Sequence, residues 1–471
     1  MDRSKVFLRR VYDCSPIILQ NFAISLLGGI HQRQRFGGIF KEQLLQAENR
    51  KALTREALEE YQFTELVRFI SFADKNSAYY NEVFKKIGFT PADLRSVHDL
   101  SLLPILEKSD LQKHSRDIQS VPDSKIIHRI KTSGTTGTPL SAGFIARDLQ
   151  TRFAFLYRML GEYGITYRSK SVRFSGGTFF PNAEKNHIFW RHSFLRNQLF
   201  MSSYHLKKEF VVSYIDKLRS FKPDLIDGYP SAIYLIAQQV IESSRVGEFM
   251  PKVFMCTGET LEDYQRDVIK TAFPGSIVLN QYASAEGAPF ITQDIKGNLV
   301  VNTDSGVFEF FRPGTMEPAK PGEIAELVVT SFTTHAFPLI RYRIGDTVRL
   351  SDQCSKDCPM PIVSGIYGRR DDLVYTKYRG WVGRLSPAIK AGPETIREAQ
   401  VQQLSDNAFV LRIVPSASFR RADADIIINE LKNRLGPVDI NIELHERGLS
   451  RGPNGKLRSV IGLPRHSREH N

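Results

Sequence analysis

A run of hydroxyl-bearing residues and glycines at residues 132–139 (Thr-Ser-Gly-Thr-Thr-Gly-Thr-Pro) offers the clearest chemistry in this sequence. The two glycines allow the backbone to turn tightly and to approach a ligand closely. The hydroxyls and successive backbone N–H groups can then surround phosphate oxygens. The run is not a Walker A motif, because no Lys-Ser or Lys-Thr pair follows the second glycine. A polar turn between two strands is the alternative, and the loop alone does not decide between the two.

Four segments further along the chain also combine charged residues with glycine. They are residues 281–287 (Gln-Tyr-Ala-Ser-Ala-Glu-Gly), 342–346 (Tyr-Arg-Ile-Gly-Asp), 368–372 (Gly-Arg-Arg-Asp-Asp) and 455–458 (Gly-Lys-Leu-Arg). With the loop, they resemble in order the motifs of the adenylate-forming superfamily, which includes acyl-CoA synthetases, peptide-synthetase adenylation domains and luciferases. Residues 227–231 (Asp-Gly-Tyr-Pro-Ser) and the short helical N-terminal region are similar to the phenylacetate–CoA ligase-like branch. More narrowly, they are similar to CapK-type proteins associated with capsular polysaccharide synthesis.

The resemblance implies a ligase that works in two half-reactions. A carboxylate attacks the α-phosphorus of ATP to give acyl-AMP and pyrophosphate, and the acyl group then passes to coenzyme A or to an amine. Because an anion must approach a polyanion, the site has to neutralise charge during the attack. The narrower likeness implies a place in surface polysaccharide biosynthesis. Two alternatives are an adenylyltransferase that leaves AMP on its substrate and a nucleotide-binding scaffold without catalysis.

Individual residues of the motifs receive roles from the same resemblance. The loop would hold the β- and γ-phosphates of ATP, and Glu286 would act in catalysis by holding Mg²⁺, which prefers carboxylate and phosphate oxygens. Tyr282 would stack on adenine, and Asp346 would bind the ribose hydroxyls. The remaining expected nucleotide-binding residues are Ser133, Gly134, Thr135, Thr136, Gly137, Thr138, Gly258, Glu259, Ser284, Ala285 and Arg369. The structural alternatives are a capping glutamate, a core tyrosine, a turn aspartate and a surface salt bridge.

Lys456 and Asp371 would serve the chemistry from the C-terminal part of the chain. Lys456 would reach the cleft and neutralise charge between the carboxylate and the α-phosphate, although a solvated lysine is the alternative. Asp371 matches the family's hinge, about which a small domain moves between the half-reactions. Two residues depart from the family pattern: Leu140 replaces a lysine found in many members, and Ala285 replaces a threonine before the metal-binding glutamate.

The acyl group is expected to meet residues that follow predicted strands, where ligand contacts are common. Arg173, Phe179, Phe180 and Tyr229 are the expected pocket residues, and Arg191 and His187 offer positive charge for an acidic group. The phenylalanines can equally belong to the core. Cys354 and Cys358 are expected to be free thiols, because two further ligands for a zinc site are not evident nearby.

The composition fits a globular protein that can position such residues. The 471 residues are 41% apolar and 24% charged, which excludes fibrous and wholly disordered classes. The net charge of +13 permits an anionic partner such as a nucleotide without requiring one, and no nucleic-acid partner is expected. Four cysteines are too few for a disulfide framework in a chain of this length, so a reducing, cytoplasmic location is expected.

Strands and helices alternate along most of the chain, which predicts an α/β fold of helix-covered sheets. Three parts are expected: a helical N-terminal part at residues 1–120, an α/β core at 121–368 and a small mobile α+β unit at 369–471. Strands are predicted at 125–131, 140–145, 172–174, 225–226, 253–256, 277–279, 326–330, 409–414 and 440–444. Helices are predicted at 47–72, 209–218, 231–243, 261–273 and 423–435.

The apolar segment at residues 16–30 is shorter than the roughly 20 residues that a membrane span needs. It is expected to be a helix that packs on the large domain. A helix lying on a membrane surface is the less favoured alternative, for which the basic residues on either side would suit anionic lipid.

Overall fold

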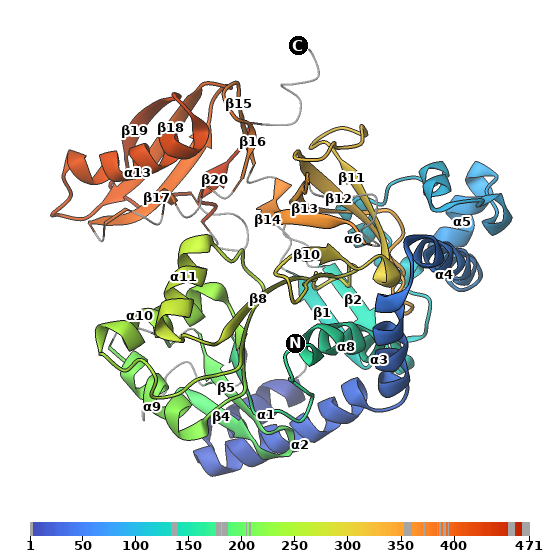
Figure 1. Cartoon of the computed structure of the whole chain (residues 1–471), viewed down its shortest axis with the longest axis horizontal. Helices are drawn as coiled ribbons and strands as arrows, with labels where there is room; N and C mark the ends of the chain where they lie inside the picture. Colours follow the sequence, from blue (N-terminus) through green and yellow to red (C-terminus); the bar gives the residue numbers. More distant parts are fainter. Residues whose placement is uncertain are drawn as a thin grey trace.

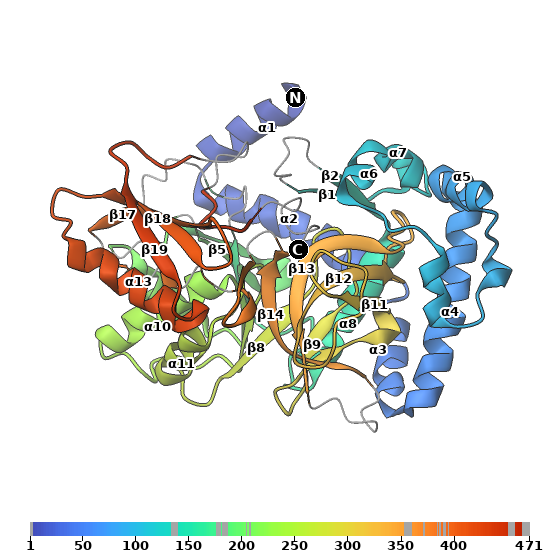
Figure 2. The same cartoon turned by 90° about the horizontal axis from the view of Figure 1, so that it is seen from above.

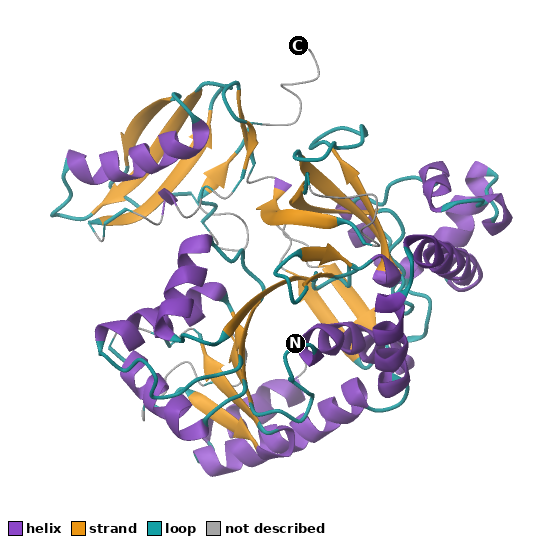
Figure 3. Ribbon diagram, viewed as in Figure 1, coloured by secondary structure: helices purple, strands orange, loops and turns teal. Residues whose placement is uncertain are grey.

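The computed structural model describes residues 3–132, 140–175, 180, 187–203, 205–206, 209–352, 360–370, 373–383, 385, 388–389, 392–393, 395–450 and 457–463. Its architecture is α/β, as the sequence predicts. A large sheet with helices on its faces forms the main body, and a second, smaller sheet with its own helix lies beside it (Figures 1 and 3).

Helices dominate the first 125 residues. The α-helices are α1 (Arg3–Cys14), α2 (Ile17–Phe36), α3 (Phe40–Asn49), α4 (Arg55–Asn76), α5 (Ala78–Ile87), α6 (Lys108–Lys113) and α7 (Ser115–Ile118). Short 3-10 helices join them: η1 (Arg50–Ala52), η2 (Pro91–Asp93), η3 (Val97–Leu102) and η4 (Asp123–Lys125). The single helix predicted at 47–72 is wrong in one respect, because the chain breaks before α4. There the Thr54 side chain accepts a hydrogen bond from the Ala57 N–H and caps a new helix.

The parallel half of the large sheet holds β5 (Gln198–Ser202), β3 (Ser171–Ser175), β6 (Leu225–Gly228), β7 (Val253–Cys256) and β8 (Ile277–Tyr282), in that spatial order. The antiparallel strand β4 (Trp190–Ser193) pairs with β5 and forms this edge of the sheet. The 3-10 helix η5 (Phe194–Arg196) follows β4 in the chain. Helices α9 (Val211–Phe221), α10 (Pro230–Glu242) and α11 (Asp263–Ala272) share one apolar core with the sheet. Residues of α8 (Ala146–Gly161) pack with other residues of the same strands. Strands covered on both faces read as continuous apolar runs, which explains why the sequence located them.

The antiparallel half continues from β8 without interruption. Strand β8 pairs in parallel with β7 and antiparallel with β9 (Ile291–Gln293), so it belongs to both halves. The remaining strands are β10 (Leu299–Val301), β11 (Gly306–Phe311), β12 (Ile324–Ser331), β13 (Tyr342–Leu350) and β14 (Ile362–Arg369), with η6 (Thr303–Ser305) before β11. A separate hairpin of β1 (His128–Thr132) and β2 (Leu140–Phe144) flanks the predicted phosphate loop.

The C-terminal unit has its own four-stranded sheet and its own core. Its sheet order is β19 (Asp439–Leu444), β18 (Ala408–Pro415), β17 (Ile396–Gln403) and β20 (Val460–Ile461), and α13 (Arg421–Leu435) packs on it. A two-stranded hairpin, β15 (Val374–Thr376) with β16 (Gly380–Val382), precedes these elements. Along the chain, the last strand of the large sheet is β14, which ends at Arg369, and the first strand outside it is β15. The domain boundary at residue 369 stays a prediction. The unit lies over the α10–α11 side of the body (Figures 1 and 2).

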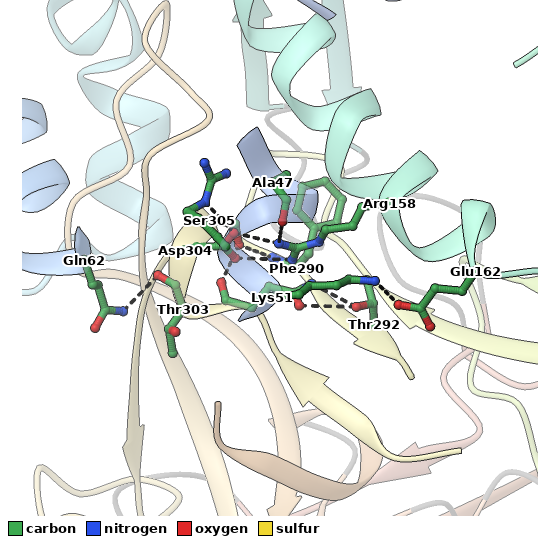
Figure 4. A network of polar contacts seen from close by, with 12 residues as sticks. Ala47, Lys51, Gln62, Arg158, Glu162, Phe290, Thr292, Thr303, Asp304 and Ser305 are labelled. Atoms are coloured by element: carbon green, nitrogen blue, oxygen red, sulfur yellow. Dashed lines mark hydrogen bonds and ion pairs between the residues drawn. The ribbon is translucent and has the colours of Figure 1, made fainter. Parts of the chain in front are cut away.

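A buried ionic network fastens the N-terminal helices to the large sheet. Asp304 in η6 is almost fully buried and pairs with Arg158 of α8 at 2.6 Å and with Arg50 of η1 at 2.9 Å. Figure 4 shows the Arg158 guanidinium directed at Asp304, and Gln62 of α4 donating to the Thr303 carbonyl. The network therefore joins α4, η1, α8 and η6 around one carboxylate.

No helix in the described part of the chain is both long and apolar enough to cross a membrane.

Candidate active site

Three of the predicted nucleotide-binding side chains meet where the last residues of β8 and β14 lie beside the middle of β13. The hydroxyl of Tyr282 donates to Oδ2 of Asp346 at 2.8 Å. Nε of Arg369 lies 3.1 Å from Oδ1 of the same carboxylate, and the Arg369 side chain also donates to the Ile344 carbonyl. The sheet register explains the meeting, because Asp346 of β13 and Arg369 of β14 are direct partners. The result is a carboxylate with 14% of its side chain exposed and a donor on each oxygen.

Burial dominates the electrostatics of this cluster. It raises the pKa of the Asp346 carboxyl, while the nearby Arg369 guanidinium and the Tyr282 hydrogen bond act in the opposite direction. Burial also raises the pKa of Tyr282 well above its ordinary value, and the negative charge of Asp346 adds to that effect. Tyr282 is therefore a neutral hydroxyl donor at physiological pH.

Glu286 lies on the turn that follows β8, close enough to influence the same cluster. Its charge raises the pKa of Asp346 and of Arg369. The Glu286 side chain is buried, and within the described residues no hydrogen bond or ion pair occupies its carboxylate. The described residues hold no group of three or more His, Cys, Asp or Glu side chains that could bind a metal by themselves. A lone free carboxylate fits Mg²⁺, which usually takes one or two protein carboxylates together with phosphate oxygens.

The turn that carries Glu286 is tightly fixed from both sides. The Ser284 hydroxyl accepts hydrogen bonds from the N–H groups of Gly287 (3.2 Å) and Ala288 (3.0 Å). Arg152 of α8 donates to the carbonyls of the same two residues at 2.8 and 2.9 Å. Gly287 adopts a φ of +106°, and a Cβ there would lie 2.3 Å from Cγ2 of Thr334. The local chain thus requires glycine next to the predicted metal ligand.

The Gly258 loop after β7 adjoins this region. Gly258 has a φ of +78°, and a Cβ there would lie 3.0 Å from the ring of Tyr229. Glu259 accepts a hydrogen bond from the N–H of Ser231 near the start of α10. A Cβ on Gly368 would lie 3.8 Å from Oγ1 of Thr260, so the loop also approaches the end of β14. The structure therefore brings Gly258, Glu259 and Tyr229 together, a short distance from Arg369.

A pocket of about 260 Å³ opens beside residues 283–285. Its walls include Phe144, Phe153, Leu156, Met255 and Phe290, which are apolar, and Arg35, His128, Arg152, Arg173 and Asp227, which are polar or charged. Two predicted nucleotide-binding residues, Ser284 and Ala285, and one predicted substrate residue, Arg173, line it together. The pocket therefore adjoins residues predicted for the nucleotide and a residue predicted for the acyl group.

Phe180 and Arg191 lie in a different environment. Phe180 is buried in a small cluster with Ile24 of α2 and Phe200 of β5, and it is absent from the pocket walls. Arg191 is fully buried and donates to the Gln20 side chain and to the carbonyls of Ile188 and Trp190. The structure thus gives both residues a packing role under α2.

Several predicted residues lie outside the described part of the chain: Ser133, Gly134, Thr135, Thr136, Gly137, Thr138, Phe179, Cys354, Cys358, Asp371 and Lys456. Their expected roles remain predictions.

Four pocket or site residues escaped the sequence reasoning: Arg35, His128, Arg152 and Arg196. Arg35 comes from α2, Arg196 from η5 and Arg152 from α8, and none belongs to a motif. Arg152 lies four residues after Asp148 on α8, and Asp148 accepts hydrogen bonds from the N–H groups of His335 and Ala336. The i, i+4 spacing of Asp148 and Arg152 was the one feature of the sequence that could have pointed to Arg152.

Comparisons with known proteins show what the whole chain is similar to. The family model described as the CapK C-terminal domain matches residues 374–462. Protein CapK of Staphylococcus aureus is 33% identical over 465 residues, which cover 96% of this chain and 99% of that protein. A phenylacetate-coenzyme A ligase of Pseudomonas putida is 25% identical over 68% of this chain and 72% of its own length. The crystal structure of a 2-hydroxyisobutyryl-CoA ligase in complex with an acyl-AMP shares the fold, with a TM-score of 0.62 and 19% identity over 87% of this chain and 90% of that one.

The similarity to protein CapK and to the phenylacetate-coenzyme A ligase, together with the shared fold, places the chain in the adenylate-forming superfamily, on its phenylacetate–CoA ligase-like branch. Within that class, the near full-length similarity shows that it belongs to the CapK family.

Proposed function

We propose that this protein is an ATP- and Mg²⁺-dependent ligase that activates a carboxylate as acyl-AMP with release of pyrophosphate. The observation that carries the proposal is the largely buried Asp346 carboxylate, held between Tyr282 and Arg369 beside the turn of Glu286. A buried anion with fixed donors is a good acceptor for ribose hydroxyls. The turn places a second carboxylate at the same edge of the sheet.

Each described residue then has a task in the first half-reaction. Asp346 accepts hydrogen bonds from the ribose, and Tyr282 and Arg369 keep its carboxylate oriented. Glu286 would hold Mg²⁺, which would supply positive charge to neutralise the phosphates. Arg152 and Ser284 fix the backbone around Glu286, so that the carboxylate does not have to be reorganised during the reaction. The pocket beside Ser284 holds the acid close to the nucleotide.

The C-terminal unit would complete the site. A cleft of about 870 Å³ separates it from α11, with Tyr264 on one wall and Trp381 and Arg434 on the other. Movement of this unit about Asp371 would bring Lys456 to the reacting carboxylate, as the superfamily resemblance implies. For the second half-reaction we propose coenzyme A or an amine as the acyl acceptor. The phenylacetate-coenzyme A ligase relatives favour the thiol, and the CapK-type likeness motivates a place in surface polysaccharide biosynthesis.

The direct test is pyrophosphate release from ATP against a panel of carboxylic acids, with and without EDTA. We expect release that depends on one class of acid and stops when EDTA removes the metal. Lys456→Ala should lower the rate by about 100-fold, the typical worth of one group that stabilises transition-state charge. Lys432→Ala, an exposed lysine on α13, is the matched control and should keep the wild-type rate. Acid-independent rates, or equal rates in both variants, would contradict the proposal.

Mass spectrometry of the products separates the remaining functions. A ligase frees AMP and gives an acyl product, whereas an adenylyltransferase leaves AMP joined to its substrate. The departures from the family pattern at Ala285 and Leu140 motivate the third alternative, a nucleotide-binding scaffold. Such a scaffold would bind ATP in calorimetry without turnover on any acid.

A further inference from the structure

The wall of the acyl pocket that faces α2 carries an excess of positive charge. Arg35 of α2 and Arg173 of β3 line the pocket, and Arg196 of η5 lies within electrostatic reach of both. Asp227 of β6 is the single carboxylate among the charged groups that act on Arg35 and Arg196 in the described structure, and all three arginines act on Asp227. Three guanidinium groups thus face one carboxylate.

The sheet explains how this cluster forms. Arg173 of β3 pairs with Asp227 of β6, so their side chains leave the same face of the sheet. On that face Nη1 of Arg173 lies 3.2 Å from Oδ2 of Asp227. Oδ1 of Asp227 is buried and has no hydrogen-bond partner in the described part of the chain. The Arg35 guanidinium lies 4.8 Å from the centre of the Phe153 ring, an apolar and uncharged partner.

Burial and the excess of positive charge lower the pKa of several groups near the pocket. Burial, together with the charges of Arg196 and Arg173, lowers the pKa of Arg35 to about 9. Burial and the charges of Arg35 and Arg196 lower the pKa of His31 to about 4. The neighbouring His128 also has a lowered pKa, through burial and the charge of Arg35. The histidines around the pocket are therefore neutral at physiological pH and relieve part of the repulsion.

The Arg173 side chain is 46% exposed, and Arg35 and Arg196 are half-buried, so water screens part of this positive charge and a bound anion would balance the rest. The carboxylate that reacts must lie at the α-phosphorus, on the side of Ser284 and Ala285. Arg173 and Asp227 lie instead on β3 and β6, on the far side of β7 from the end of β8. An acid long enough to reach from Ser284 and Ala285 to Arg173 would present a second group to the arginines.

We propose that the acid activated here carries a second anionic group, a carboxylate, phosphate or sulfonate, which Arg35 and Arg173 bind. This inference rests on the proposed ligase function and narrows its substrate class. Arginine suits the task because its planar fork binds carboxylate and phosphate oxygens in pairs. Asp227 positions Arg173, and its negative charge lowers the net positive charge of the pocket.

The test compares matched acids in the pyrophosphate assay. Linear dicarboxylates from malonate to adipate are paired with their monomethyl esters, and sulfoacetate and phosphoglycolate replace the second carboxylate. We expect kcat/KM for the best dianion to exceed that of its monomethyl ester, which keeps a single carboxylate, by about 100-fold, as for loss of one charge-assisted pair. Arg173→Gln should reduce that ratio at least tenfold through KM. Asp227→Asn should lower KM for the dianion.

Arg219→Gln is the matched control, because it removes the same charge from the exposed surface of α9. Equal rates with dianions and with their monomethyl esters would overturn the inference while leaving the ligase function intact. Absence of release with any acid would overturn both. A thermal-shift arm is independent of turnover: succinate or glutarate at millimolar concentration should raise the Tm of wild type and not that of Arg173→Gln. Equal shifts in both proteins would also contradict the inference.

A second observation, independent of the pocket, concerns the outer face of α2. Its inner face is buried through Gln20, Ile24, Ser25 and Gly28 against β4 and η5. Its outer face exposes large apolar side chains, from 51% at Leu26 to 80% at Ile18, and Phe194 and Leu195 of η5 are exposed next to it. The exposed apolar residues of α2 are Ile18, Leu19, Phe22, Leu26, Leu27 and Ile30. Figures 1 and 2 show α1 and α2 along the periphery of the molecule.

The charges around this face suit an anionic surface. Residues 1–36 contain six Lys or Arg residues against two aspartates. Asp13 is paired with Arg9 at 2.8 Å, whereas Arg10 and Arg33 at the two ends of the face are exposed. A helix with an apolar face between basic residues is typical of interfacial membrane binding. We infer that the α2 face docks on a membrane that contains anionic lipid.

Vesicle flotation tests this second inference. We expect the full chain to float with vesicles of phosphatidylglycerol and phosphatidylcholine at low salt and to remain unbound with phosphatidylcholine alone. Phe22→Ser with Leu26→Ser should abolish flotation, and Ile295→Ser with Met316→Ser, on exposed sites elsewhere, should not. Failure of the wild type to float would overturn the inference. So would a concentration-dependent dimer in size-exclusion chromatography that the first pair of substitutions dissolves, because a second copy would then cover the face.

Discussion

Tyr282 and Asp346 form one unit, although 64 residues separate them in the chain. The tyrosine hydroxyl donates to the carboxylate at 2.8 Å, and both side chains are largely removed from water. The resemblance assigns the tyrosine to the base and the aspartate to the ribose of the same nucleotide. The hydrogen bond therefore couples the two expected contacts, because displacement of either side chain moves the other.

Tyr282→Phe tests this coupling, since it keeps the ring and removes the donor. The Asp346 carboxylate would lose one of its two fixed partners in a buried site, at a cost of about 1.5–3 kcal/mol. We expect KM for ATP to rise by about tenfold or more in the pyrophosphate assay. Tyr375→Phe, in the C-terminal unit, is the control and should behave as wild type. An unchanged KM for ATP in Tyr282→Phe would show that the hydroxyl does not orient Asp346.

Gly287→Ala should disturb both stability and metal binding. The residue has a φ of +106° and lacks room for a Cβ next to Thr334, so strain adds to a clash. We expect a loss of about 2–4 kcal/mol in the free energy of unfolding, and a higher Mg²⁺ requirement for turnover. Gly314→Ala has a φ of +81° with open space around it, and it should cost about 1 kcal/mol. Similar losses in the two variants would mean that the contact with Thr334 is unimportant.

Asp304→Asn should be strongly destabilising. It removes the charge that balances Arg158 and Arg50, and the arginine and aspartate side chains at this place are nearly excluded from solvent. An uncompensated buried charge typically costs about 3–5 kcal/mol. Urea denaturation should show this as a lower midpoint. Glu59→Gln breaks an exposed pair with Arg55 and should cost less than about 1 kcal/mol. A comparable midpoint shift for both variants would be the contrary result.

His31 should make the protein less stable in mild acid. Its folded-state pKa is about 4, below the ordinary value of 6.5, because it is partly buried beside Arg35 and Arg196. Above pH 6.5 it is neutral in both states and costs nothing. As the pH falls from 6.5 toward 4, the unfolded chain binds a proton that the folded chain does not, so the free energy of unfolding decreases.

The urea midpoint measured at pH 7, 5.5 and 4.5 checks this behaviour. His31→Gln should reduce the decline over that interval relative to wild type. His98→Gln, which removes a histidine from the separate η3 region, should leave the slope as it is. Parallel pH profiles for wild type and His31→Gln would contradict the expectation.

The sequence located the parallel half of the large sheet well. Strand β7 was predicted with its observed bounds, and β6 and β8 were found from short apolar runs, because both faces of these strands are covered. Helices α9, α10 and α11 were each located to within three residues by their apolar periodicity. Periodicity failed near Thr54, where apolar residues continue at helical spacing through a break that the capping hydroxyl stabilises.

The antiparallel half was harder to predict. Strands β9 and β10 have three residues each, too few to show an alternating pattern, and the pairing of β13 with β14 contains two register shifts. The motif residues of the site were found by resemblance, and the structure brings Tyr282, Glu286, Asp346 and Arg369 into one cluster. The arginines of the pocket wall could not be found in this way. Arg35 and Arg196 come from elements 161 residues apart, and only the folded chain brings them close.

The double membership of β8 also limits how the protein can move. One strand is hydrogen-bonded on one side to a parallel neighbour and on the other to an antiparallel neighbour, so a continuous seam of backbone bonds crosses the body. Moving the two halves of the sheet apart would break these backbone hydrogen bonds beside Tyr282. Any large rearrangement during turnover must therefore leave the twelve-stranded body rigid, and a spectroscopic label pair spanning β6 and β12 should report a constant distance throughout the reaction cycle.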